Sequence, residues 1–157
     1  MRSKHLTRTL PVAVMILSGS AAIAATASQV IAARQARYTD LGKSFKAIND
    51  QLKAGTPDLA VIRANATTVA RLAQLQHRQT WFPAGTQAGQ GLKTAAKPAI
   101  WQNAADFTAK RTAFANAAAS YGAIAAKGDI NAIKAATASV GQTCKSCHES
   151  YRDRDKS

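Results

Sequence analysis

Apolar side chains recur in alternating steps of three and four residues along most of this 157-residue chain, and no stretch alternates with a period of two. Steps of three and four place side chains on one face of an α-helix, whereas a period of two would indicate a β-strand. The first such face, with one charged position, comprises Ile31, Arg34, Tyr38, Leu41, Phe45, Ile48 and Leu52. The spacing therefore predicts an all-α fold.

Glycine and proline residues divide this pattern into four predicted helices. The first ends at Gly55, after which Thr56-Pro57-Asp58 supplies an N-cap, a first-turn proline and a first-turn acid for the second. The second helix fades near His77. A third helix is predicted from Pro98 to Gly128.

Asp129 is predicted to cap a fourth helix, whose inner face includes Cys144, Cys147 and Tyr151. Residues 80–98, between the second and third helices, contain several glycines and are predicted to form the one long loop. Alanine, the strongest helix former, is abundant. Helices of this length with short connections predict an antiparallel four-helix bundle.

The first 24 residues are typical of a cleaved secretory signal peptide. They begin with basic residues and no acid, continue through eight mainly apolar residues, and then become small and Ala-rich. A membrane anchor is the alternative, but spanning takes about 20 mainly apolar residues. Cleavage is predicted after Ala24, with Ala27 as the alternative end, so that residues 25–157 form one periplasmic domain.

The chain is strongly basic, with 21 Lys and Arg residues against 8 Asp and Glu residues. The leader holds three of the bases and none of the acids, so the predicted mature chain has 18 against 8, a formal charge of +10. Because these charges are spread along every segment, they favour a solvated cationic surface over a nucleic-acid site. We expect no nucleic-acid partner, no membrane contact after cleavage, and faster association with anionic partners.

The segment Cys144-Lys145-Ser146-Cys147-His148 has the spacing of a c-type haem attachment motif. Two thiols at this spacing reach the two vinyl groups of one porphyrin edge, and the next residue turns its imidazole toward the iron. On a helix, Cys144 and His148 lie one turn apart, so both are expected on the inward face. The motif predicts one haem c per chain, bound covalently by Cys144 and Cys147 and through its iron by His148.

Three other uses of the two cysteines compete with haem attachment. An oxidising compartment permits a disulfide between them. A structural zinc site needs four N or S ligands, whereas the predicted mature chain adds only His77 and His148 to the thiols. A thioredoxin-like redox site needs a βαβ context, which the pattern lacks. Haem attachment is therefore favoured.

The methionines bear on how the iron is ligated. Both of them, Met1 and Met15, lie in the predicted signal peptide, so the mature chain has no Met to bind iron opposite His148. His77 is the one other histidine of the mature chain, and its place at a fraying helix end favours a surface role. The iron is expected to be five-coordinate, with an open face inside the bundle.

Several short motifs, in this order and spacing, make the chain resemble the cytochrome c′ family. They are Arg34-Gln35-x-x-Tyr38, Trp81-Phe82-Pro83-x-Gly85-Thr86, Ile100-Trp101 with Phe107, and Cys144-x-x-Cys147-His148-x-x-Tyr151-Arg152. The resemblance implies a periplasmic, usually dimeric, antiparallel bundle. It also implies a five-coordinate haem that takes up NO and CO and scarcely binds oxygen.

The resemblance further implies roles on the distal side of the haem. Tyr38 falls at the position of the bulky side chain that shields the open iron face, although a core Tyr is the plainer reading. Arg34 would pair with a haem propionate, the alternative being a solvent-facing side chain. Gln35 would make a second, weaker haem contact.

On the proximal side, Arg152 lies one helical turn after His148, and the resemblance places it beside the imidazole. As part of a charged tail, it could equally be solvated. Trp81 and Trp101 are expected to pack around the haem edge.

These expectations describe a periplasmic haem protein that binds NO and CO and can transfer electrons. The alternative is a plain periplasmic electron carrier without a gas-binding role, whose redox partner the sequence does not name. An enzyme such as a peroxidase is not expected, because it would need a distal acid–base pair and no His or acid shares the face of Tyr38. A homodimer through the first two helices is also expected.

Overall fold

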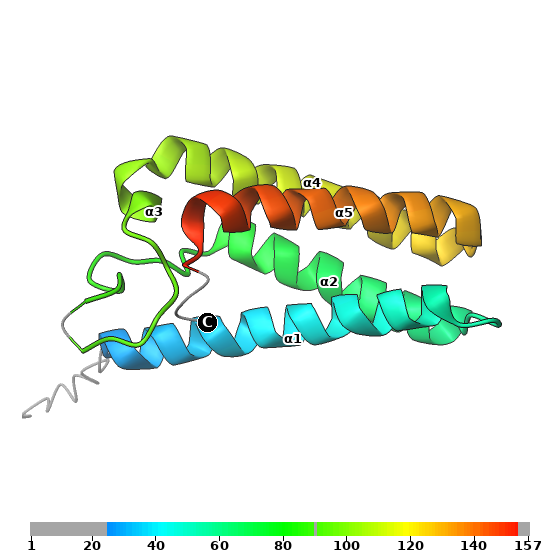
Figure 1. The fold of residues 1–157 in the computed structure, drawn as a ribbon, viewed down its shortest axis with the longest axis horizontal. Coiled ribbons are helices and arrows are strands. Elements are labelled where there is room, and N and C mark those ends of the chain that lie inside the picture. The colour runs from blue at the N-terminus through cyan, green and yellow to red at the C-terminus, as the bar shows by residue number, and fades with distance from the viewer. Residues whose placement is uncertain (1–24, 90, 154–157) are drawn as a thin grey trace, which may run out of the picture.

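The computed structural model describes residues 25–89 and 91–153 and contains five α-helices. They are α1 (Ala27–Lys53), α2 (Leu59–Arg78), α3 (Ala99–Gln102), α4 (Ala104–Lys127) and α5 (Ile130–Tyr151). The four long helices run alongside one another in alternating directions, and α3 is a short turn at one end (Figure 1). The predicted all-α four-helix bundle is therefore confirmed. The predicted signal peptide, residues 1–24, lies outside the described residues.

The bundle has two different ends (Figure 1). At the turn end, short connections join α1 to α2 and α4 to α5. At the loop end lie the long connection between α2 and α4, the start of α1 and the end of α5. Within residues 25–89 and 91–153, each helix is too short or too polar to span a membrane.

The start of α2 differs from the prediction, because its N-cap is Asp58 and not Thr56. The Asp58 carboxylate accepts hydrogen bonds from the backbone N–H groups of Ala60 (2.7 Å) and Val61 (3.2 Å). An ionised carboxylate at the positive end of a helix accepts these bonds and also interacts favourably with the helix dipole. The helix therefore begins after the acid, and Pro57 precedes the cap. Asp129 caps α5 in the same way, as predicted.

The helix predicted from residue 98 to 127 is in fact two helices. Asn103, with φ −119° and ψ 51°, interrupts it between α3 and α4. The short α3 turns Ile100 into a cluster with Phe107 and Tyr151, and the Trp101 indole N–H donates to a loop carbonyl. The break lets α3 cover the loop end while α4 runs along the bundle. Apolar spacing alone does not predict this break.

A continuous apolar core runs between α1, α2, α4 and α5. Its fully buried side chains include Ile48, Ile62, Val69, Tyr121, Ile133 and Val140. A second, smaller cluster of Ala96, Ile100, Phe107 and Tyr151 closes the loop end. Cys144 packs against the main core and Cys147 against the smaller cluster, so the cysteine motif sits where the two meet.

Candidate functional site

The two cysteines of the motif lie near the end of α5. Both are half-buried and neither forms a disulfide. Burial raises the pKa of Cys144 above its usual range and raises the pKa of Cys147 to about 11. Both thiols are therefore protonated at neutral pH, which does not favour a redox-active dithiol, since the thiolate is the reactive form.

His148 lies one turn after Cys144 on α5. The sequence predicted that it faces the core, but the residue is exposed. Each residue advances an α-helix by about 100°, so a residue four positions on is displaced by about 40°. That displacement carries His148 past the buried stripe that Val140 and Tyr151 mark. The motif thus presents two half-buried thiols and an imidazole at the margin of the same face.

The described part of the chain brings no cluster of metal ligands to the thiols. Between residues 25 and 153, residue 90 aside, no group of three or more His, Cys, Asp or Glu side chains could hold a metal ion. His77 is exposed in the last turn of α2, as expected for a surface residue.

Arg34 is a buried residue that clamps the long loop. Its side chain is 3% exposed. One terminal nitrogen donates to the carbonyl of Trp81 (3.2 Å) and the hydroxyl of Thr86 (3.0 Å). The other donates to the carbonyl of Thr86 (3.2 Å) and the hydroxyl of Thr94 (2.9 Å), and the guanidinium lies 4.3 Å from the Phe82 ring centroid. The solvent-facing alternative is therefore wrong.

The clamp uses most of the hydrogen-bond donors of the Arg34 guanidinium. A guanidinium carries five N–H donors, and the four terminal N–H groups of Arg34 match the four loop contacts. These loop contacts do not test the propionate contact, which stays a prediction. Sequence reasoning missed the clamp, because its partners lie 47 to 60 residues away along the chain.

Gln35 and Arg152 are both exposed at the loop end. The Gln35 amide donates to the backbone carbonyl of Lys93 (3.1 Å) and so also holds the loop. Arg152 is the C-cap of α5, and its backbone N–H donates to the carbonyl of His148 (3.0 Å). Their haem contacts stay predictions.

Tyr38 lies one turn after Arg34 on α1 and is held at both ends of its side chain. Its ring stands edge-on to Trp81, with the ring centroids 5.4 Å apart and the planes at 81°. Its hydroxyl donates to Oε1 of Gln76 on α2 (3.2 Å). Burial raises the pKa of Tyr38 well above its usual range, so the hydroxyl keeps its proton at neutral pH.

Gln76 is a site residue that sequence reasoning missed. It is 2% exposed and occupies the next inward position of α2, one turn after Leu72. An amide at a position where the helix otherwise buries apolar side chains was the available signal, because buried polar groups need partners.

Two buried donors at this end have no hydrogen-bond partner among the described residues, Trp81 Nε1 and Arg111 Nε. Arg111, on α4, donates from Nη2 to the carbonyl of Gln79 (2.8 Å), and its pKa is lowered by burial and raised in smaller part by Tyr38 and Cys147. It therefore lies close to both the motif and the distal candidate. Buried donors normally have acceptors, so the residues here fit a bound group that supplies hydrogen-bond acceptors.

Aromatic rings form an edge-to-face series at the loop end. Phe82 and Phe107 lie 5.1 Å apart, Phe107 and Tyr151 5.0 Å, and Phe82 and Trp101 6.2 Å, measured between centroids. The Tyr151 hydroxyl donates to Asp106 (2.5 Å), and burial followed by this bond raises the pKa of Tyr151 to about 12. These rings join the loop to α4 and α5 and supply an apolar wall beside Cys147.

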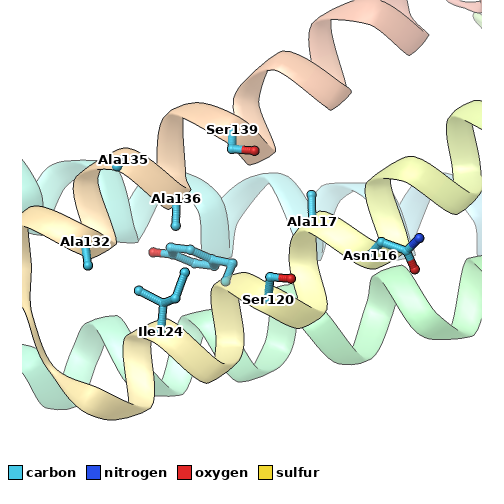
Figure 2. A pocket seen from close by; sticks show the side chains of 9 residues that line it. Asn116, Ala117, Ser120, Ile124, Ala132, Ala135, Ala136 and Ser139 are labelled. Atoms are coloured by element: carbon cyan, nitrogen blue, oxygen red, sulfur yellow. The ribbon is translucent and has the colours of Figure 1, made fainter.

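A hollow of about 480 Å³ lies elsewhere, on the surface between α4 and α5 (Figure 2). Alanine and serine side chains such as Ala132, Ala136 and Ser120 line much of it. It contains no titratable group besides Tyr121, whose hydroxyl accepts a hydrogen bond from Thr137 (3.3 Å). The chemistry of the chain is therefore concentrated at the loop end.

Comparison with known proteins identifies the family. A family model described as cytochrome c′ matches residues 29–152. The chain belongs to the cytochrome c′ family. The cytochrome c′ of Cereibacter sphaeroides is 36% identical over 146 residues, which cover 92% of this chain and 97% of that protein.

Solved cytochromes c′ share the fold. A cytochrome c′ with ligand-controlled dimer dissociation aligns with a TM-score of 0.78 and 31% identity, covering 84% of this chain and 100% of its own. A nitric oxide complex of a cytochrome c′ variant from Alcaligenes xylosoxidans aligns with a TM-score of 0.72 and 32% identity, covering 83% and 98%. The family expected from the sequence motifs is thus confirmed.

Proposed function

We propose that this chain carries one haem c, attached covalently through Cys144 and Cys147, with His148 binding its iron. The motif spacing, the two half-buried thiols and the unpartnered donors of Trp81 and Arg111 support this assignment. The haem supplies an iron centre that binds gaseous ligands and changes oxidation state. The protein holds that group between the aromatic wall and the core.

The observation that carries the functional proposal is the state of Tyr38. Its ring is fixed by Trp81, and its hydroxyl is donated to Gln76 and keeps its proton. A protonated, hydrogen-bonded Tyr is a poor iron ligand, and His77 is exposed on α2. Tyr38 would therefore cover the iron face opposite His148 without binding the iron, which would be five-coordinate.

The remaining site residues contact the haem periphery. Arg34 would pair with a haem propionate, with Gln35 as a weaker contact, and Arg152 would lie beside the His148 imidazole. Arg111 adds a second cationic side chain near Cys147.

The function that follows is binding of NO and CO, with electron transfer as a further role and no catalytic one. A related cytochrome c′ has been solved with nitric oxide. The side chains that the structure describes around Tyr38 are aromatic, amide, cationic and thiol groups, whereas peroxidase chemistry needs an acid–base pair.

An optical spectrum of the reduced protein tests this function. We expect a five-coordinate, high-spin spectrum without added ligand and a large change on adding NO or CO. A low-spin, six-coordinate spectrum in the absence of ligand would contradict the proposal and favour a plain electron carrier.

We also propose that the chain is exported to the periplasm and that its signal peptide is cleaved, and the start of α1 bears on the position of cleavage. The backbone N–H of Gln29 donates to Thr26 Oγ1 (3.3 Å), and the backbone N–H of Thr26 donates to Gln29 Oε1 (2.8 Å), which is a capping box. Cleavage after Ala24 keeps this cap, whereas cleavage after Ala27 removes Thr26. We therefore favour Ala24, which the N-terminal sequence of the exported protein will test.

We also propose a homodimer through α1 and α2. A similar cytochrome c′ shows ligand-controlled dimer dissociation. Sedimentation at micromolar concentration, with and without CO, should show a dimer in the absence of ligand, and a monomer under both conditions would exclude it.

A further inference from the structure

Gln76 is the polar exception on the buried face of α2. The other buried positions of this helix are Ile62, Ala66, Val69, Leu72 and Ala73. Burying an amide is unfavourable unless it finds a hydrogen-bond partner. The partner of its Oε1 is the Tyr38 hydroxyl, on a different helix and 38 residues away in the chain.

The hydrogen bond acts on a side chain that is already fixed at its ring. Trp81 contacts the Tyr38 ring edge-on, and Phe82 lies 6.3 Å away at 49°. Gln76 adds a tether at the far end, so the phenol cannot swing without breaking a partly buried hydrogen bond. A Tyr hydroxyl has one hydrogen to donate, and here that hydrogen is directed to Gln76.

We infer that Gln76 is a positioning residue that holds Tyr38 over the distal face and withholds its hydroxyl proton from a bound ligand. The inference rests on the proposed distal role of Tyr38. It has two consequences. A ligand entering the distal side must displace a tethered ring, and a bound ligand meets the ring and not a hydrogen-bond donor.

Replacing the amide by an alkyl group of similar size separates these consequences. In Gln76→Leu the tether is lost, and we expect CO to bind the reduced protein about three- to tenfold faster, the effect of losing one hydrogen bond. The freed hydroxyl can donate to bound CO, so the C–O stretching frequency should fall. In Tyr38→Phe the association rate should rise similarly without that fall, and the double variant should match Tyr38→Phe.

Gln74→Leu is the matched control. Gln74 lies on the same helix, and its amide donates to the backbone carbonyl of Ala115 on α4 (3.2 Å). This variant loses a hydrogen bond of similar burial outside the distal contact. Its CO association rate and C–O frequency should equal those of the wild type.

The crystal structure of ligand-free Gln76→Leu provides a readout independent of ligand binding. We expect the Tyr38 ring to leave its edge contact with Trp81 or to show two orientations. A ring in its original place, with an unchanged CO rate and C–O frequency, would overturn the inference. Should Gln76→Leu not fold, Gln76→Asn shortens the amide by one methylene and should give the same rate increase.

Tyr38→Ala separates this inference from the function on which it rests. If Tyr38→Ala leaves CO kinetics unchanged, the distal role of Tyr38 is wrong. If Tyr38→Ala speeds binding while Gln76→Leu and Tyr38→Phe do not, the distal role stands and the positioning role of Gln76 fails.

Discussion

The two ends of the bundle bury different kinds of side chain. At the turn end, Asp58 and Asp129 cap their helices, and the core between them is apolar, with Ile62 and Ile133 fully buried. The loop end instead contains four of the six buried polar or charged residues that the structure describes, Arg34, Gln76, Thr86 and Thr94. The loop end also carries the cysteine motif and both unpartnered donors.

This difference indicates that the two ends have different roles in the folded protein. Apolar burial is favourable without a partner, so the turn end can stabilise the fold by itself. Buried polar groups cost free energy unless they are hydrogen-bonded, and those at the loop end hold a long loop against α1. The buried polar groups of the loop end therefore hold the loop in place beside the cysteine motif.

The largest expected effect comes from removing the covalent link at the loop end. In Cys144→Ala with Cys147→Ala, no thiol remains to form a thioether, so the haem should extract completely into acid-acetone. The mass of the wild-type chain should include one haem and that of the double variant none. Ser146→Ala, an exposed change within the same motif, should keep the haem, and covalent haem in the double variant would refute the attachment.

A second test asks whether the turn end stabilises the fold without touching the site. Ile133 is 0% exposed near the start of α5. Ile133→Ala should lower the free energy of unfolding by about 4 kcal/mol, and Ile133→Val by about 1 kcal/mol. Urea denaturation measures the loss, while the reduced spectrum and CO binding should not change. An altered CO rate in Ile133→Ala would show that the two ends are coupled.

The features that could be predicted from the sequence are the local ones, and those that could not are contacts between distant residues. Apolar spacing and caps are local signals, so the four long helices, the Asp129 cap and the cysteine motif could all be predicted. The Arg34 clamp and the Tyr38–Gln76 bond join positions 38 to 60 residues apart, and spacing within one helix carries no information about such pairs.

Two local features were also missed, for a different reason. Asp58 and Thr56 are both good N-caps, and the sequence does not show which one the chain uses. The break at Asn103 falls within a run that is apolar on both sides, so only the packing of α3 against the loop end reveals it.

The loop clamp is the third test. Arg34→Met keeps a long side chain but leaves the oxygens of Trp81, Thr86 and Thr94 without their donor, which should lower the free energy of unfolding by about 3 kcal/mol. Amide hydrogen exchange should accelerate in residues 81–94 and not at the turn end. Arg34→Lys retains the charge without the planar fork and should recover only part of the loss. Unchanged exchange in the loop would show that Arg34 does not hold it.

The smallest effect concerns Tyr151, which links the aromatic wall of the loop end to Asp106 on α4. The folded protein raises the pKa of Tyr151 to about 12, above the reference value of about 10 for an unfolded chain. Between about pH 10 and about pH 12 the unfolded state loses the phenol proton while the folded state keeps it. The free energy of unfolding therefore falls as pH rises. The full contribution is present below about pH 10 and is lost progressively as pH rises toward about 12. A matched variant isolates this contribution. Tyr151→Phe lacks the titrating group, so the difference in unfolding free energy between wild type and Tyr151→Phe should shrink over this range.

Other groups titrate alike in both proteins and cancel in that difference. A difference that stays constant from about pH 9 to pH 12 would show that the loop end does not hold Tyr151 protonated.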